Sequence, residues 1–218
     1  MLRDRGYALD IRRPCLGQSL PETLEGYDGV IVFGGPMSAN DCHDYIRQEI
    51  DWLKVPLAEE KPFLGICLGA QLLSRHLGGI VQPHPHGRVE IGYYPLKPTP
   101  AGEELFSWPS HVYHWHREGF SLPSGAVLLA EGDDFENQAF RYGRNAYGIQ
   151  FHPELTLHML HRWTVKGASR IDLAAGAQPR SLQFEGRRIH DSAVRAWLVD
   201  FLDHWLDTGP STLAVAAE

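Results

Sequence analysis

The chain has 218 residues, of which 43% are hydrophobic and 22% are charged, a composition that excludes a mainly disordered protein and allows a sizeable buried core. Its 27 acidic side chains outnumber the 20 basic ones and give a formal charge of -7, which disfavours binding to nucleic acid or to an anionic membrane.

The cysteines and the apolar runs indicate in which compartment of the cell the protein is found. Cys15, Cys42 and Cys67 are odd in number and widely spaced, which favours a reducing environment over a disulfide framework. No apolar run approaches the roughly 20 residues that a membrane helix needs. The first residues also lack the apolar stretch of a secretory signal. The sequence therefore predicts a cytoplasmic protein that does not enter a membrane.

The first part of the chain alternates between buried strands and helices. Residues 30–33 and 62–66 are short, unbroken apolar runs that end in glycine-containing turns, which is typical of strands covered on both faces. Apolar residues at helical spacing predict a helix over 45–53 between them. Leucines at 68, 72, 73 and 77 predict a second helix, which glycines 78 and 79 end.

In the second half of the chain, the residue pattern is first typical of strands and then of helices. Short alternating stretches predict strands at 89–96, 111–115, 127–131, 138–142 and 147–151. Helical spacing then predicts helices over 155–166 and 191–206. Because no linker or repeat divides the chain, we expect one domain over 1–207, with a helical extension at about 155–207 and a frayed tail at 208–218.

A cysteine elbow is the sharpest local signal. Gly65-Ile66-Cys67-Leu68-Gly69 lies where a buried strand meets an apolar helix. A residue on such a turn projects above the sheet, and the two glycines permit close backbone approach. The N-terminus of a helix also favours a thiolate. Cys67 is thus a candidate nucleophile, and the alternative is a cysteine that only packs in the core.

A candidate base follows the strand at 147–151. A thiol nucleophile needs a base and a group that orients the base. Residues two apart in an extended segment point the same way, so His152 and Glu154 can face one site. The carboxylate would then fix the tautomer of the imidazole. The alternative is a solvated turn around Pro153.

A glycine pair follows the first buried strand. Gly34 and Gly35 either make a simple turn or aim a backbone N–H at the cleft above the carboxyl edge of the sheet, where open α/β sheets bind ligands. With the N–H of Leu68, such a group would form an oxyanion hole.

These three motifs, in this order, resemble the class I, or triad-type, glutamine amidotransferase family. The family joins a Gly-Gly-Pro loop, a G-x-C-x-G elbow closely followed by glutamine, and a late H-P-E, which match residues 34–36, 65–71 and 152–154. The resemblance spans about residues 26–155. It implies an α/β fold with a flavodoxin-like, open, mostly parallel sheet flanked by helices, a small antiparallel portion and a helical C-terminal extension, as in a stand-alone amidotransferase domain similar to that of GMP synthase.

The resemblance also implies roles. Cys67 would attack the side-chain amide of glutamine, His152 would transfer the proton and Glu154 would orient His152. Gly35 and Leu68 would hold the oxyanion. Glutamate and ammonia would be the products, with no cofactor and no metal.

Substrate contacts are expected at two further places. Gln71 shares a helical face with Cys67, and in the family a glutamine here contacts the substrate. The alternative is a partly exposed helix residue. Residues 115–120 resemble the family's S-H-x-D-type loop over the amino-acid end of the substrate, although Trp115 and Glu118 depart from the usual small residue and shorter acid. The expected substrate-binding residues are Gly34, Gln71, His116, Arg117 and Glu118.

The histidines invite a competing metal hypothesis. His114 and His116 share one strand face, but no acid or cysteine at ligand spacing completes a set nearby, so we expect ordinary surface or loop histidines. The glycine pair is too short for a phosphate cradle, which disfavours nucleotide binding.

Three functions remain open. The first is glutamine hydrolysis, with ammonia passed to a synthase partner or released by a stand-alone hydrolase. A γ-glutamyl peptide hydrolase with the same triad and a non-catalytic regulatory module are the alternatives. The family's fold ordinarily begins with a strand and helix before residues 7–11, so we expect that the natural start lies upstream, that the chain is trimmed, or that another segment fills that place in the sheet.

Overall fold

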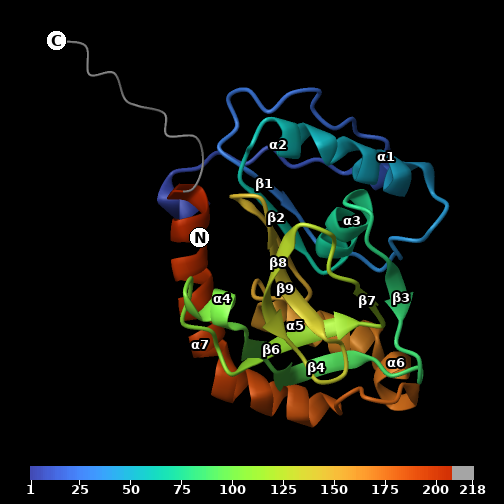
Figure 1. Cartoon of the computed structure of the whole chain (residues 1–218). Coiled ribbons are helices and arrows are strands. Elements are labelled where there is room, and N and C mark those ends of the chain that lie inside the picture. The colour runs from blue at the N-terminus through green and yellow to red at the C-terminus, as the bar shows by residue number, and fades with distance from the viewer. Residues whose placement is uncertain (208–218) are drawn as a thin grey trace.

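A computed structural model describes residues 1–207, in which a six-stranded sheet has the order β1-β2-β10-β9-β8-β5 (Figure 1). Three adjacent strands are parallel: β1 (Val30–Val32), β2 (Phe63–Ile66) and β10 (Ala146–Ile149). All residues of β2 and β10 are buried, as their unbroken apolar runs predicted. Among the described residues no strand pairs with the outer edge of β1, so none of them fills the place expected for an additional strand.

The other half of this sheet is antiparallel. It contains β9 (Asn137–Tyr142), β8 (Ala126–Glu131) and β5 (Lys97–Pro98). Short connections join β8, β9 and β10, and strands joined in this way lie antiparallel. The α/β class is therefore confirmed, and the sheet is mixed where we had expected a mostly parallel one.

Helices cover the two faces of the sheet. On one face lie α1 (Asp44–Trp52), α2 (Lys54–Ala58) and α3 (Leu68–His76). The opposite face is covered by α7 (Arg180–Asp207) (Figure 1). Successive residues of β2 serve the two layers: Phe63 packs in the cluster of α1 and α3, and Leu64 packs in the cluster of α7. This alternation is what a strand geometry requires.

Two small antiparallel ribbons lie beside the main sheet. One pairs β4 (Glu90–Pro95) with β6 (His111–His116), and the other pairs β3 (Val81–Pro83) with β7 (Glu118–Phe120). The remaining short helices are η1 (Arg3–Arg5), η2 (Pro14–Leu16) and α4 (Pro100–Glu103). The expected small antiparallel portion is therefore present.

The C-terminal region is helical, as predicted, with α5 (Leu157–Lys166), α6 (Ala168–Leu173) and α7. Helix α7 begins at Arg180 rather than at residue 191. Its early part contains Gly186, a weak helix former, but an added Cβ there would lie 2.6 Å from the ring of Tyr93, so close packing explains the glycine. The predicted frayed tail, 208–218, lies outside the described residues.

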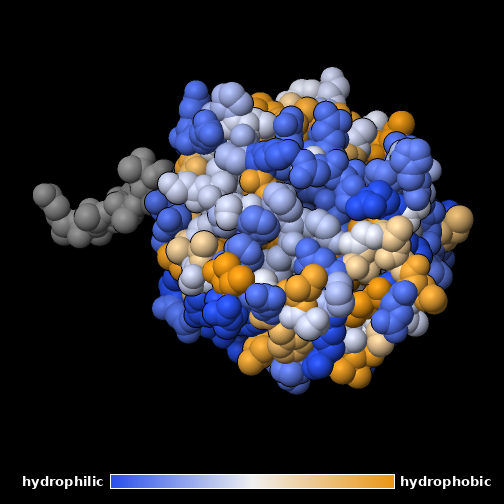
Figure 2. Space-filling model, turned by 90° about the horizontal axis from the view of Figure 1, so that it is seen from below, coloured by the Kyte–Doolittle hydropathy of each residue, from blue (hydrophilic) through white to orange (hydrophobic). Residues whose placement is uncertain are grey.

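Apolar and hydrophilic side chains are interspersed on the lower face of the molecule (Figure 2). None of the helices described over residues 1–207 combines the length and the apolar character needed to cross a membrane.

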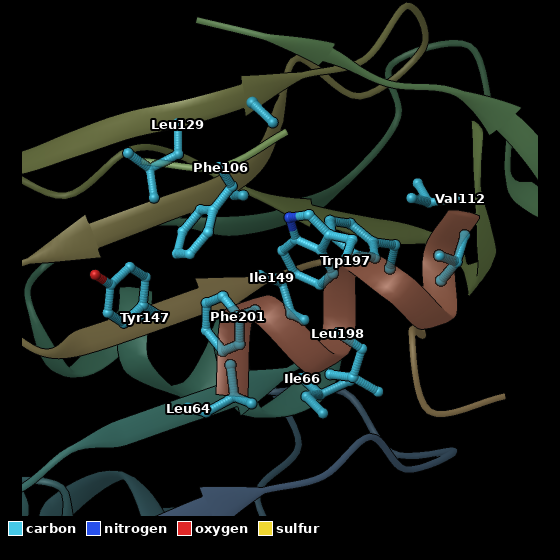
Figure 3. Packing of buried hydrophobic residues seen from close by; sticks show 14 of the residues in the cluster. Leu64, Ile66, Phe106, Val112, Leu129, Tyr147, Ile149, Trp197, Leu198 and Phe201 are labelled. Carbon is cyan, nitrogen blue, oxygen red and sulfur yellow. The ribbon is translucent and has the colours of Figure 1, made fainter. Parts of the chain in front are cut away.

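Aromatic side chains of α7 fill the core against the sheet (Figure 3). Trp197 and Phe201 stack with their ring centroids 5.0 Å apart, and both belong to one buried cluster with Leu64, Tyr147 and Ile149 of β2 and β10. The helical extension therefore completes the core that supports the carboxyl ends of these strands.

Candidate active site

Cys67 occupies a strained turn between β2 and α3. Its φ of 52° lies in the left-handed region, which a residue other than glycine adopts at a cost of about 1–3 kcal/mol. The neighbouring glycines make this turn possible. A Cβ at Gly69 would lie 2.1 Å from the carbonyl oxygen of Val32, and one at Gly65 would lie 2.5 Å from the backbone of Gly69. The local geometry is the elbow that the sequence predicted.

The thiol of Cys67 is buried and lies beside Gln150 and His152. Its residue is 6% exposed. Nε2 of Gln150 donates to the sulfur at 3.6 Å. The ring of His152 is close enough to Cys67 that an added Cβ at Gly34 would touch both side chains. The structure thus brings residues 67 and 152, distant in sequence, into one site.

His152 links Cys67 to Glu154. Its Nδ1 lies 2.7 Å from Oε1 of Glu154, and the edge of the ring meets Trp163 at a centroid distance of 4.9 Å. Burial disfavours the charged ring, but the interactions with Glu154 and Cys67 outweigh burial and raise the pKa of His152 to about 10. The ring is therefore protonated at neutral pH.

The glycine loop lies directly against these side chains. A Cβ added to Gly34 would be 2.8 Å from Cε1 of His152 and 3.2 Å from Cβ of Cys67. One added to Gly35 would be 3.3 Å from Cδ2 of Leu68, the first residue of α3. The glycine loop thus lies against Cys67, His152 and the first residue of α3. Backbone N–H groups in such a position can donate hydrogen bonds to a developing negative charge.

Gln71 and Glu118 meet beside the glycine loop. Nε2 of Gln71 donates to the carbonyl oxygen of Glu118 at 2.8 Å and to Oε1 of Gln150 at 3.2 Å. The Glu118 carboxylate accepts from Oγ of Ser38 at 3.0 Å, which ties the loop after β1 to β7. Arg117 extends outward, with 67% of its side chain exposed.

The expectation for His114 and His116 was wrong. Both rings are buried, and Glu90 of β4 completes a cluster with them because the β4–β6 register places Glu90 opposite His116. Oε2 of Glu90 lies 2.9 Å from Nε2 of His116 and 3.4 Å from Nδ1 of His114. An acid 26 positions before His116 gives no local ligand spacing, which is why the sequence did not reveal it.

These three groups are of metal-ligand type, but hydrogen bonds already satisfy the carboxylate. Gln138 donates to the same Oε2 at 3.0 Å, and Nδ1 of His116 contacts the Glu118 carbonyl at 3.0 Å. Burial raises the pKa of Glu90, but His114 and His116 outweigh burial and lower it to about 2. Burial chiefly lowers the pKa of His114 to about 3. Glu90 is thus a buried, ionised carboxylate held by the rings of His114 and His116 and by Gln138.

Gln150 and Trp163 were missed at the sequence level. For Gln150 a signal was present, because it stands two residues before His152 and so projects to the same side of the extended chain. Trp163 comes from α5 and had no local signal, since its contact with His152 depends on how α5 packs.

A match to a known family shows to which protein family the chain belongs. The sequence model described as glutamine amidotransferase class-I matches residues 1–163, about three quarters of the chain. The chain belongs to this family. Its resemblance in the three motifs is therefore confirmed as membership of the class-I glutamine amidotransferases.

Class-I glutamine amidotransferases similar to this one include single-chain proteins and part of a larger enzyme. A glutamine amidotransferase-like protein of Salmonella typhimurium, YfeJ, is 32% identical over 206 residues, which cover 89% of this chain and 81% of YfeJ. GMP synthase of Porphyromonas gingivalis is 36% identical over 143 residues, which cover 62% of this chain and 26% of the synthase. The chain thus spans about a quarter of that synthase.

Solved structures show the same fold over nearly the whole chain. A glutamine amidotransferase of Methylobacillus flagellatus superposes with a TM-score of 0.87 at 26% identity, covering 96% of this chain and 88% of that one. A glutamine amidotransferase of Thermotoga maritima gives 0.83 at 27% identity, covering 94% and 90%. The similarity includes the C-terminal helices.

Proposed function

We propose that this class-I glutamine amidotransferase hydrolyses the side-chain amide of glutamine to glutamate and ammonia through a thioester on Cys67. The observation that supports it most is the burial of Cys67 beside His152, whose Nδ1 lies 2.7 Å from Oε1 of Glu154. The name of the similar GMP synthase records glutamine hydrolysis by that protein. The expectation from the three sequence motifs points to the same reaction.

In the proposed first step, the Cys67 thiolate attacks the amide carbon. Negative charge develops on the carbonyl oxygen, and the backbone N–H groups of Gly35 and Leu68 are the proposed donors to it. His152, held as an imidazolium, gives its proton to the leaving nitrogen. Ammonia departs and a thioester remains on the sulfur.

In the second step, water attacks the thioester. The now neutral His152 takes a proton from the water, the sulfur leaves as a thiolate, and glutamate is released. Glu154 acts as a positioning residue by holding Nδ1 of the ring. The reaction needs glutamine and water, and a synthase partner is the proposed acceptor of ammonia where one binds.

The test is a direct assay of ammonia and glutamate release from glutamine by the full chain. Turnover should be lost in Cys67→Ala and kept in Cys42→Ala, which removes an exposed cysteine. An electrophilic glutamine analogue should add its mass to Cys67. If high analogue concentrations add no mass and no ammonia is released, the protein is a non-catalytic module and the proposal fails.

The substrate is tested in the same assay. Release from glutamine is compared with release from γ-glutamyl dipeptides at equal concentrations. We expect glutamine to be preferred. A preference of about tenfold or more for the dipeptides would overturn glutamine as the substrate and indicate a γ-glutamyl peptide hydrolase with the same triad.

A further inference from the structure

We propose that Gln150 is a further catalytic residue, whose side-chain amide donates a hydrogen bond to the Cys67 thiolate before attack and again when the sulfur leaves. The proposal deepens the proposed function and rests on Cys67 being the nucleophile. It assigns chemistry to a residue that none of the three recognised motifs uses in this way.

The position of Gln150 supports this role. The residue is fully buried, and its backbone N–H is bonded to the carbonyl oxygen of Gln138 at 2.8 Å, which continues the pairing between β10 and β9. From this fixed backbone, Nε2 reaches to 3.6 Å from the sulfur. The sulfur therefore has a neutral donor in Gln150, on the same side of the chain as His152.

Gln71 determines which end of the Gln150 amide faces the sulfur. Because Nε2 of Gln71 donates to Oε1 of Gln150 at 3.2 Å, the oxygen end is occupied and the nitrogen end is turned to Cys67. A reversed amide would place an acceptor oxygen against the thiolate and two NH2 donors, of Gln71 and Gln150, against each other. Gln71 is itself held by the Glu118 carbonyl at 2.8 Å, so the orientation is fixed by the surrounding structure.

The Glu118 carbonyl has a second support. Nδ1 of His116 lies 3.0 Å from it, and Glu90 lies behind His116. A continuous series of hydrogen bonds thus runs from β4, through the Glu118 carbonyl and Gln71, to Gln150 and the sulfur. The buried cluster is thereby connected to Cys67 through hydrogen bonds.

The charge balance explains why a neutral donor is useful here. A buried thiolate requires hydrogen-bond donors to offset its lost hydration. The titratable groups that bear on the pair of Cys67 and His152 are Glu154 and His114. When His152 has given up its proton, the amide of Gln150 still donates, so the leaving sulfur keeps one partner throughout the cycle.

Alkylation of Cys67 by iodoacetamide tests the proposal without any substrate. The rate is followed from pH 5 to pH 9 by peptide mass spectrometry on the full chain, with exposed Cys15 and Cys42 as internal references. Gln150→Met removes the donor, and Gln150→Glu keeps an acceptor for Gln71 but removes the N–H groups. Both variants should alkylate Cys67 about tenfold more slowly at neutral pH, with recovery at high pH and unchanged rates at the references.

A matched control separates this effect from a loss of stability. Gln183 is also fully buried but bonds to Tyr113 and not to Cys67. Gln183→Met should lower the urea midpoint and leave Cys67 alkylation unchanged. Gln150→Asn, with an amide too short to reach the sulfur, serves if Gln150→Met does not fold.

The outcomes distinguish the two proposals. Folded Gln150 variants with the same alkylation profile as the parent chain would overturn the role of Gln150, even if glutamine is hydrolysed. A shifted profile without glutaminase activity would overturn the proposed function and leave the hydrogen bond established. If both proposals hold, the Gln150 variants should lose kcat with little change in KM.

Discussion

Around Cys67, single residues fix a conformation that the chain would not adopt alone. The positive φ of Cys67 persists because Gly65 and Gly69 allow the strand and helix to approach within contact distances that a Cβ would prevent. Gly34 has a related function, since an added Cβ would enter the space of the His152 ring. These glycines, which have no side chain to make a polar contact, are therefore as restricted as the residues of the proposed triad.

The first prediction concerns Glu154. Cys67→Ala should reduce glutamine hydrolysis to background, whereas Glu154→Ala should lower kcat by about 10²-fold, because the histidine remains but is no longer oriented. The carboxylate also helps to raise the pKa of His152 to about 10. The imidazolium is lost as pH rises through that value, so removal of Glu154 should move the alkaline loss of activity to lower pH.

This prediction is checked by steady-state rates of ammonia release over a pH series. Glu154→Gln, which keeps an oxygen near Nδ1 but no charge, is the conservative control and should retain more activity than Glu154→Ala. A Glu154→Ala variant as inactive as Cys67→Ala would show that the carboxylate does more than hold the ring.

At the scale of elements, the pairing of β4 with β6 builds the acid–histidine cluster. Antiparallel register sets Glu90 opposite His116, and the β6 alternation brings His114 to the same face. Neither strand carries the cluster by itself. The Glu118 carbonyl, which the cluster supports, then connects this ribbon to α3 through Gln71.

The second prediction uses the charge of Glu90. Its pKa falls from the ordinary 4.5 to about 2, so its ionised form stabilises the fold above pH 4.5, and this contribution is lost as pH falls toward 2. Glu90→Gln should lower the free energy of unfolding by about 3 kcal/mol at pH 7, because it leaves the buried groups around the carboxylate, His114, His116 and Gln138, without their charged acceptor. The difference from the parent chain should shrink below pH 4.5.

Urea unfolding at pH 7 and at pH 4 measures this difference. Glu136→Gln, at an exposed acid, is the matched control and should change stability by less than about 0.5 kcal/mol at either pH. If Glu90→Gln lost the same free energy of unfolding at pH 7 and at pH 4, the side chain would contribute through packing and not through its charge.

For the whole molecule, α7 is part of the core and not an appendage. The family match ends at residue 163, yet Trp197, Phe201 and Trp205 of α7 are almost fully buried against the main sheet. Arg5 bonds to Asp203 at 2.8 Å and so connects the first turn of the chain to this helix. We therefore propose that residues 1–207 unfold as one unit.

The third prediction tests this unit. Trp197→Ala should lower the free energy of unfolding by about 3–5 kcal/mol, the usual cost of removing a large buried aromatic side chain. Ile189→Ala, in the same helix but 52% exposed, should change it by less than about 1 kcal/mol. A single urea transition, seen alike by fluorescence and circular dichroism, is expected. If α7 unfolded in a separate, earlier transition in Trp197→Ala, the proposal that residues 1–207 unfold as one unit would be wrong.

Local sequence patterns were sufficient for the parallel strands, the helices that follow them and the turn at Cys67. Those features depend on neighbours within a few residues: unbroken apolar runs give buried strands, and flanking glycines give the elbow. His152 and Glu154 could be paired for the same reason, since a spacing of two sets their directions.

Contacts between distant segments could not be predicted from local patterns and became visible only in the tertiary structure. Strand register chose Glu90 as the partner of His116, and β2–β10 pairing brought Gln150 to Cys67. The packing of Gly186 against Tyr93 lengthened α7 beyond its apolar pattern. Local sequence was enough to show which residues are chemically able to act, because reactivity is a property of the side chain and its immediate neighbours. Strand register and helix packing bring these distant residues into contact. Both depend on free energies summed over the whole core, which no local pattern contains.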